Sequence, residues 1–517
     1  MYRYVLLILV LVLGFAIRMI HLQNPPLDFN STRQYRSIIL TRAIFLDFSP
    51  STDLLSSKLA EINRESEGPL EPPVMEYISA VAYRLVGQEV LWIPRLLSIL
   101  LWLLSGYILY LLASRFFSFT SAIIALSLFL FIPFGIVASR SFQPESLMLL
   151  FLLLSLLSIL QYFDSPSMVR LVRLLLVAAL AILIKPTCVF LIGSVFLIYN
   201  FTSPRSVKQR IGVALAFLFI SLTPPILYYL NTIQTHAPIA MYPHFWLEGF
   251  YWKGWFNQII TAIGYIGFLG GVVGMFVVMK TKARVLMMGL LFGYLIFGLT
   301  YSYHIHTHNY YQLMLLPILA LALAPLIEIA VRRIKSKFKS GNWFVISFMI
   351  AGLSLGMGSF VALHQHVNNN LNQEQTATFK TIGSLFGINF VTISFLLPHA
   401  EYEILIDTFE EIGEHVGHST RTIFLTMAYG KPLKYHGNLY GKFWPGEGDF
   451  RFFQLQEKSP LPAEERYHSM YEKHQPEYFI ITNFYEYDKQ PDLQKWLTSG
   501  YPILKETEEY LIFDMRK

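Results

Sequence analysis

Apolar runs of about 20 residues recur along the first 365 residues of this chain, separated by short polar segments. A helix rises about 1.5 Å per residue, so a run of this length crosses the roughly 30 Å hydrocarbon core of a bilayer. Charged residues make up only 14% of the 517 residues, whereas a soluble domain usually has about a quarter. We therefore expect a polytopic α-helical membrane protein.

The predicted membrane domain covers residues 1–363 and holds about eleven transmembrane helices. The first apolar run contains no small-residue cleavage site, so we expect it to be retained as the first helix. Residues 384–398 contain another apolar stretch, which could form a further membrane segment. The predicted spans are residues 4–20, 91–113, 118–138, 144–162, 171–184, 186–203, 211–229, 256–280, 284–303, 311–331 and 343–363.

Basic residues gather in alternate loops between these spans, and such loops face the cytoplasm. With about eleven spans, this rule places the N-terminus inside and the residues after 363 outside. We therefore predict a multi-pass protein of the plasma or inner membrane, with an extracytoplasmic C-terminal domain. The basic residues that set this orientation are Arg115, Arg170, Arg173, Arg205, Lys208, Arg210, Lys280, Lys282, Arg284, Arg332, Arg333, Lys335, Lys337 and Lys339.

The first outer loop, residues 21–90, is long and carries two amphipathic segments. Residues 36–48 and 74–86 both have apolar side chains at helical spacing, a pattern typical of helices that lie in the membrane surface. For residues 74–86, a short re-entrant or spanning helix is an alternative.

Residues 364–517 differ in composition from the rest of the chain, because charged residues become frequent there. Short β-rich runs at 422–427, 478–482 and 510–513 alternate with helical patterns such as 463–474. This alternation predicts a small extracytoplasmic α/β domain. The single cysteine, Cys188, excludes a disulfide framework and a cysteine metal cluster.

Three carboxylates lie beside the membrane on the predicted outer face: Asp28, Glu71 and Glu145. Ionisable groups are costly there and are functional candidates for that reason. Asp28 could act as a general base on an acceptor hydroxyl or amine, or it could cap the following helix. The alternative for Glu71 is that its negative charge only stabilises the N-terminus of a helix. The alternative for Glu145 is an ion pair with Arg140.

Lys185 separates two apolar runs and is followed by Pro186, which predicts a break between helices. A lone ammonium at the outer surface suits a phosphate, and Arg33, Arg36 and Arg42 could serve the same anion. The alternative is that Lys185 only extends toward lipid headgroups.

The tract 304–311 contains three alternating histidines, His304, His306 and His308. Zinc binding is conceivable, but alternating histidines in a loop do not by themselves form a tetrahedral site. We predict no certain cofactor, with a divalent metal as the alternative. The chain has no Walker motif, dinucleotide glycine fingerprint or HExxH motif, which argues against ATP-driven transport and zincin proteolysis.

An ordered series of short motifs along residues 1–335 resembles the bacterial members of the protein O-mannosyltransferase superfamily, which have the GT-C fold. These enzymes use polyprenyl-phosphate sugars and include the lipid A aminoarabinose transferase. The motifs are Pro26-Leu27-Asp28-Phe29 with Arg33-Gln34, Glu71-Pro72-Pro73, Pro94-Arg95-Leu96-Leu97-Ser98, Ser139-Arg140 with Pro144-Glu145, Lys185-Pro186, and His308-Asn309-Tyr310-Tyr311 with Leu316-Pro317.

The resemblance implies an outward-facing site with Asp28 as catalytic base and Glu71 and Glu145 as supporting acids. Lys185 is implied to meet the lipid phosphate. Two positions depart from many relatives, because Phe29 replaces a second acid and Pro72 replaces a lysine. The further residues implied in substrate binding are Arg33, Gln34, Arg140, His308, Tyr310 and Tyr311.

The predicted function is that of a membrane hexosyl- or pentosyltransferase. It would move a sugar from a polyprenyl-phosphate donor to an envelope glycan, lipid or protein. A lipid or solute transporter without catalysis is the main alternative, and an assembly protein with a decayed site is a third. Transporters often contain repeated halves, and no such repeat is seen in this sequence.

Overall fold

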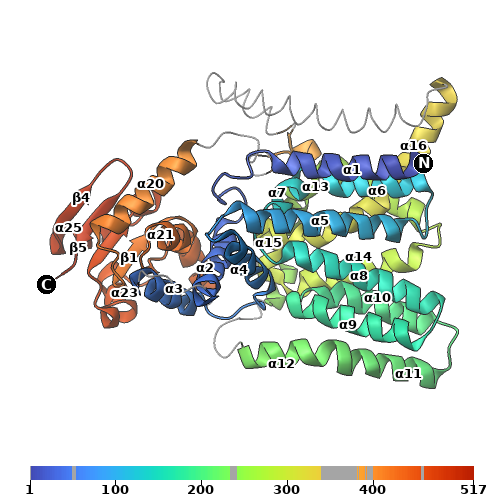
Figure 1. Cartoon of the computed structure of the whole chain (residues 1–517), viewed down its shortest axis with the longest axis horizontal. Helices are drawn as coiled ribbons and strands as arrows, with labels where there is room; N and C mark the ends of the chain where they lie inside the picture. The colour runs from blue at the N-terminus through green and yellow to red at the C-terminus, as the bar shows by residue number, and fades with distance from the viewer. Residues whose placement is uncertain are drawn as a thin grey trace. The chain divides into compact units, whose positions relative to one another are not determined.

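A computed structural model describes residues 2–48, 54–232, 241–338, 381, 383–389, 392, 400–455 and 459–516 (Figure 1). The chain divides into two compact units. The first, called the helical unit, contains Met1–Leu22, Pro69–Met75 and Pro94–Pro398. The second, called the α/β unit, contains Gln23–Gly68, Glu76–Ile93 and His399–Lys517.

Long apolar helices dominate the helical unit, and the predicted spans from 4–20 to 311–331 coincide with them. The predicted span 343–363 lies outside the described residues. The helices are α1 (Tyr2–Met19), α5 (Trp92–Ala113), α6 (Phe119–Phe131), α7 (Pro133–Ser139), α8 (Glu145–Asp164), α9 (Met168–Ile184), α10 (Cys188–Thr202), α11 (Val207–Ala216), α12 (Thr223–Thr232), α13 (Gly249–Val278), α14 (Arg284–Thr300), α15 (Ser302–Thr307) and α16 (Leu315–Phe338).

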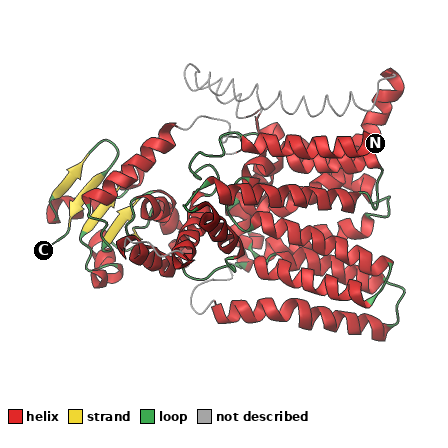
Figure 2. Cartoon of the chain, viewed as in Figure 1, coloured by secondary structure: helices red, strands yellow, loops and turns green. Residues whose placement is uncertain are grey.

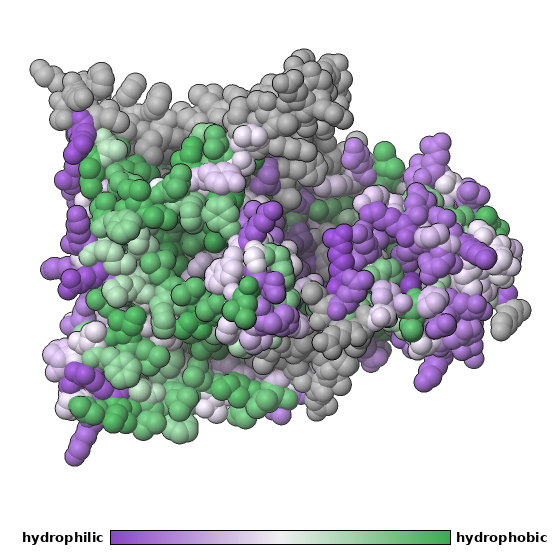
Figure 3. Space-filling model, turned by 180° about the vertical axis from the view of Figure 1, so that it is seen from behind, coloured by the Kyte–Doolittle hydropathy of each residue, from purple (hydrophilic) through white to green (hydrophobic). Residues whose placement is uncertain are grey.

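Within the described residues, five helical segments are long and apolar enough to cross a membrane, or six if one bent pair counts as a single span. Apolar side chains cover the face of the helical unit seen in Figure 3. The fold class, a polytopic helical membrane protein with a small C-terminal α/β part, is confirmed.

Two predicted spans are interrupted. The span 118–138 is a bent pair, in which α6 and α7 meet at 62°. Pro133 is the first residue of α7, and a proline cannot donate the hydrogen bond that would continue α6. The span 211–229 contains a π-helical turn, Phe217–Leu222, between α11 and α12. Pro224 and Pro225 follow one residue later, and missing backbone donors commonly produce such irregular turns.

The helix α13 is kinked at Gly264, where φ is +69°. The backbone of residues 385–387 packs directly against this kink, since a Cβ on Gly264 would lie 2.3 Å from the Gly387 nitrogen. The Asn389 side chain donates to the Thr261 carbonyl oxygen at 3.2 Å. The described part of 384–398 thus packs on α13, and the rest of that stretch lies outside the described residues.

The α/β unit is built on a five-stranded sheet in the order β2-β1-β3-β5-β4 (Figure 2). Strand β1 pairs in parallel with β2 and β3, whereas β5 is antiparallel to β3 and β4. The strands are β1 (Thr422–Leu425), β2 (Gly441–Phe443), β3 (Tyr478–Ile481), β4 (Ile503–Glu506) and β5 (Leu511–Asp514). The three predicted β-rich runs are confirmed as β1, β3 and β5.

Alternate residues of the central strands enter two separate cores. In β3, Phe479 and Ile481 pack on one face of the sheet, and Tyr478 and Ile480 pack on the other. This is the two-residue period expected of a strand buried on both faces. The helices of the unit are α2 (Ser31–Phe48), α3 (Leu54–Glu67), α4 (Val74–Val86), α20 (Ala400–His415), α21 (Lys431–His436), α22 (Glu447–Leu455), α23 (Ala463–Met470), α24 (Phe484–Asp488) and α25 (Pro491–Gly500).

The helices α2 and α3 of the first loop belong to the same compact unit as the sheet. Arg42 on α2 pairs with Glu89 at 2.9 Å and donates to the Tyr435 carbonyl oxygen of α21 at 2.7 Å. Residues 34–41 of α2 are all buried, so the prediction that this segment lies in the membrane surface is wrong. Its arginines bind partners inside the protein. The predicted boundary at 363/364 lies outside the described residues.

Candidate functional site

The position of Lys185 follows from the proline after it. Pro186 disfavours helical geometry at the preceding residue, and Lys185 accordingly has φ −149° and ψ 110°. Lys185 therefore ends α9, and α10 begins at Cys188. The predicted break is confirmed, and it places an ammonium group between two apolar helices.

Lys185 forms an ion-paired cluster with Glu71 and Glu145. Its Nζ donates to the Glu145 Oε1 at 2.5 Å and to the Glu71 Oε1 at 3.0 Å. The three side chains are each at most 10% exposed. Glu145 opens α8 and Lys185 closes α9, so each charge also lies at the helix end that favours its sign. A lysine that merely reached toward lipid headgroups would not be buried in this way.

One acceptor of this cluster has no partner among the described residues. The Glu145 Oε2 atom is buried and receives no hydrogen bond. A buried unsatisfied polar atom costs about 1–3 kcal/mol, more when it is charged. Two carboxylates and one ammonium also leave one formal negative charge. The cluster can therefore accept a hydrogen bond from a ligand hydroxyl or amine.

The histidine tract lies beside the lysine. The Lys185 Nζ is 5.8 Å from the centre of the Tyr310 ring, and His304 stacks on Tyr311 at 5.4 Å. Burial, with contributions from the charges of His308 and Lys185, lowers the pKa of His304 to about 4, so His304 is neutral near pH 7.

The three histidines do not converge on a shared centre. The Nδ1 atoms of His306 and His308 contact Ser302 and Thr307 respectively. In the part of the chain that the structure describes, no group of three or more histidine, cysteine, aspartate or glutamate side chains could hold a metal ion.

Arg140 is fully buried, and its guanidinium binds the backbone. It donates to the carbonyl oxygens of Arg18, Ile20 and His21, at and just beyond the C-terminal end of α1. Arg95 donates to the carbonyl oxygens of Leu22 and Arg140. Cations at such helix ends satisfy carbonyl groups that have no partner within the helix. These contacts give Arg140 a structural role.

An apolar groove of about 300 Å³ lies between α13, α14 and α16. Tyr294 lines this groove, and its hydroxyl donates to the Gln312 side chain. Gln312 in turn donates to the Ile305 carbonyl oxygen at 3.1 Å, within the histidine tract. A chain of contacts therefore connects the groove to the loop beside Lys185. Sequence patterns did not reveal this link, because Tyr294 and Gln312 look like ordinary residues of apolar spans.

Asp28 lies in the α/β unit, in a loop held by Gln34. The fully buried Gln34 side chain donates to the carbonyl oxygens of Pro26 and Phe29 at 3.1 and 2.8 Å, and to the Asp28 Oδ1 at 3.4 Å. The helix α2 begins at Ser31, so its cap position is Asn30. Asp28 therefore lies two residues before this cap position, and Gln34 holds the loop that carries Asp28.

The predicted residues fall into two groups, one in each unit. Lys185, Glu71, Glu145 and Tyr310 meet in the helical unit, where His308 and Tyr311 lie in the same histidine tract. Asp28, Gln34 and the half-buried Arg33 lie in the α/β unit.

Comparisons with known proteins place these features in context. Residues 70–229 match the family model of dolichyl-phosphate-mannose-protein mannosyltransferases, and no curated protein matches the sequence significantly. The crystal structure of ArnT from Cupriavidus metallidurans bound to undecaprenyl phosphate is 13% identical, with a TM-score of 0.55 over 98% of both chains. Its apo form is 14% identical, with a TM-score of 0.52 over 98% of this chain and 97% of that chain. At these identities, the structural likeness shows a shared fold.

Proposed function

We propose that the chain is a membrane glycosyltransferase that transfers a sugar from a polyprenyl-phosphate donor to an envelope glycan, lipid or protein. The match of residues 70–229 to the mannosyltransferase family model and the fold shared with ArnT support this proposal. The observation that carries this proposal is the buried cluster of Lys185, Glu71 and Glu145 in the helical unit. Charges buried in a membrane domain are costly, and they generally serve binding or catalysis.

The reaction is a single displacement at the anomeric carbon of the sugar. The acceptor oxygen or nitrogen forms a bond to this carbon, and its proton passes to the Asp28 carboxylate. The bond from the anomeric carbon to the phosphate oxygen breaks, and polyprenyl phosphate leaves with the electron pair. Asp28 acts as general base in this scheme, and no nucleotide is required.

Lys185 stabilises the departing phosphate. Its Nζ donates to both carboxylates, which hold the ammonium group in place. The positive charge of this ammonium is assigned to the phosphate, whose negative charge grows as the bond breaks. Glu71 and Glu145 keep the lysine charged and oriented, and the Glu145 Oε2 accepts a hydrogen bond from a substrate hydroxyl.

The apolar groove between α13, α14 and α16 is assigned to the isoprenoid chain of the donor. Its lining is almost entirely apolar, as a hydrocarbon chain requires. Its connection through Tyr294 and Gln312 to the histidine tract allows one molecule to use both regions. Undecaprenyl phosphate in the related ArnT structure supports a donor of this class.

The substrate is thus expected to be lipid-linked and the active site extracytoplasmic, as the basic loops predict. A transfer assay with purified protein tests the function. The protein in detergent would be mixed with a panel of polyprenyl-phosphate hexoses and pentoses and with membrane extracts as acceptor. We expect one donor to release polyprenyl phosphate in an acceptor-dependent manner. A transporter would move lipid across vesicles without releasing it from its sugar, and that result would overturn the proposal.

A further inference from the structure

A pocket of about 180 Å³ lies at the amino ends of the three parallel strands of the α/β unit. The first residues of β1 line it, together with segments around the starts of β2 and β3. Each strand thus contributes one wall. The lining residues are Thr420, Arg421, Thr422, Ile423, Tyr440, Lys442, Tyr471, His474 and Pro476.

The ionisable side chains that line this pocket are mainly basic. Arg421 is paired with Glu477 outside the lining, and Glu477 also accepts from the Ser419 hydroxyl at 2.6 Å. Lys442 instead donates to the His474 Nε2 atom. In the described ranges of the chain, no carboxylate lies within ion-pair distance of Lys442.

The contact with Lys442 requires a neutral His474, because an imidazolium has no free lone pair on Nε2. Burial and the charge of Lys442 lower the pKa of His474, which agrees with this state. Lys442 therefore carries a positive charge that no nearby carboxylate balances.

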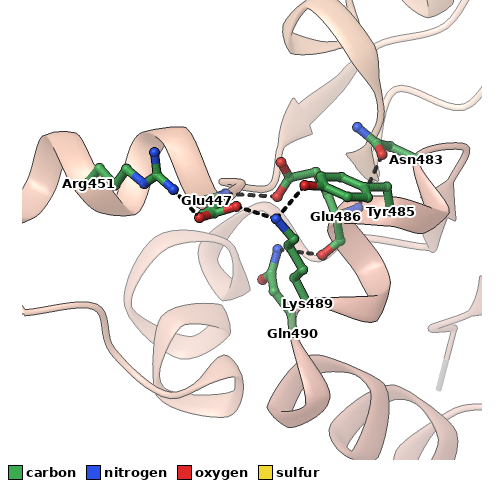
Figure 4. A network of polar contacts seen from close by, with 7 residues as sticks. All are labelled: Glu447, Arg451, Asn483, Tyr485, Glu486, Lys489 and Gln490. Carbon is green, nitrogen blue, oxygen red and sulfur yellow. Dashed lines mark hydrogen bonds and ion pairs between the residues drawn. The ribbon is translucent and has the colours of Figure 1, made fainter. Parts of the chain in front are cut away.

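The carboxyl ends of the same strands are organised in the opposite way (Figure 4). There, Glu447 follows β2 and binds both Arg451 and Lys489, and Lys489 also contacts the Tyr485 hydroxyl. Glu486 accepts from the Glu447 backbone nitrogen at 2.8 Å. The charges at that end balance one another. The amino end is the side of the sheet where a hollow and an uncompensated cation coincide.

We propose that this pocket binds a phosphate or carboxylate group carried by a saccharide, with Lys442 as the charged contact. A water molecule takes about 30 Å³ in the liquid, so the pocket has room for several waters or for one such group. Thr420, Tyr440 and Tyr471 also line the pocket, and their residue types, with hydroxyl and aromatic groups, suit a polyhydroxylated ligand. This binding site is separate from the transfer chemistry and does not depend on it.

Isothermal titration calorimetry on the full-length protein in detergent tests the proposal. The probes are glucose 1-phosphate, glucuronate, inorganic phosphate and, as the neutral comparison, glucose. We expect both saccharide anions to bind and glucose not to bind at equal concentration and ionic strength. Binding of phosphate alone would show a simple anion site and would overturn the saccharide part.

Variants of pocket residues distinguish ligand binding in this pocket from binding at other basic sites. Lys442→Gln keeps a polar side chain but removes the charge, and should weaken binding by about tenfold or more, since charged hydrogen bonds contribute about 1.5–3 kcal/mol. Lys442→Arg should retain binding. Lys495→Gln, at an exposed position of α25, is the matched control and should leave affinity unchanged.

Thr420→Glu is an independent second variant, because it places a carboxylate at the pocket wall and should abolish binding. Equal affinity of wild type, Lys442→Gln and Thr420→Glu would overturn the proposal. So would the absence of binding by both saccharide anions at about 10 mM, a concentration at which even millimolar affinity is measurable.

Discussion

Sequence patterns identified several single residues of the candidate site, but they did not identify the residues that these contact. Lys185 and Glu145 stand out as charges between apolar runs, and the Lys-Pro pair predicts the break that places the ammonium between two helices. No local pattern in the sequence indicates that Lys185 would pair with Glu71, which is 114 positions away. A contact of that kind depends on how helices pack, and packing is not encoded in local periodicity.

Asp28→Asn is expected to reduce transfer by about 10²–10⁴-fold, the usual contribution of general acid–base catalysis. Asparagine keeps the oxygen that accepts from Gln34, so the loop and the thermal stability should be unchanged. Transfer would be measured as acceptor-dependent release of polyprenyl phosphate. A rate above about a tenth of wild type would exclude Asp28 as the base.

A charge-matched double variant tests the role of Lys185. Removing Lys185 alone would leave two buried carboxylates without their cation, a change that commonly costs about 3–5 kcal/mol. Lys185→Met combined with Glu145→Gln keeps the net charge of the cluster at minus one. We expect this variant to fold but to lose binding of a polyprenyl-phosphate sugar, measured by calorimetry.

Lys185→Arg is the companion of that double variant, because it keeps the charge with a different geometry and should retain part of the binding. If the double variant binds donor as tightly as wild type, Lys185 has only a structural role in its cluster.

At the scale of elements, strands that form continuous apolar runs were predictable and the other strands were not. The runs that became β1, β3 and β5 are rich in β-branched and aromatic residues. Strand β2 has only three residues, and the residues of β4 are largely exposed, so neither carries a hydrophobic pattern. These two strands form because each pairs with another strand of the sheet, β2 with β1 and β4 with β5. The amphipathic helix at 36–48 was predicted, but its burial depends on α21, far along the chain.

The contact between α2 and α21 makes the protein sensitive to acid. The Tyr35 hydroxyl and the His436 Nε2 lie 2.8 Å apart, and burial lowers the pKa of His436 to about 3. In the unfolded chain, histidine titrates near 6.5. Below that pH the unfolded state takes up a proton that the folded state does not, so stability is present above pH 6.5 and is lost as the pH falls.

His436→Gln should reduce this loss, since glutamine can accept from Tyr35 without titrating. Each pH unit below 6.5 costs wild type at most about 1.4 kcal/mol through this group. The melting temperature of wild type should therefore fall more between pH 7 and pH 5 than that of the variant. Equal losses would assign the acid sensitivity to other groups.

At the scale of the whole molecule, the sequence predicts an orientation in the membrane. Basic loops alternate with loops poor in lysine and arginine, and the helices of the helical unit lie side by side, so alternate loops fall at the same end (Figure 1). Hydropathy gives only the positions of the spans. The distribution of basic residues predicts which end of the helices faces the cytoplasm. The extent of the α/β unit was not predictable, since it combines residues from both sides of the helical unit in the sequence.

Cysteine labelling in intact cells checks this orientation. Single cysteines would replace Ser336, in the last basic run, and Ser459, in the α/β unit, in a chain whose Cys188 is changed to alanine. An impermeant thiol reagent should label position 459 before lysis and position 336 only after it. Labelling in the reverse order would invert the topology.

The composition of the α/β unit also determines when it can form during synthesis. Arg42 binds the Tyr435 carbonyl oxygen, 393 residues later in the chain. Ribosomes add about 5–20 residues per second, so α2 and α3 emerge roughly 20–80 seconds before the partners that complete their fold. The helices between them enter the membrane during that interval. During that interval, the surface of α2 that packs on the later residues stays uncovered.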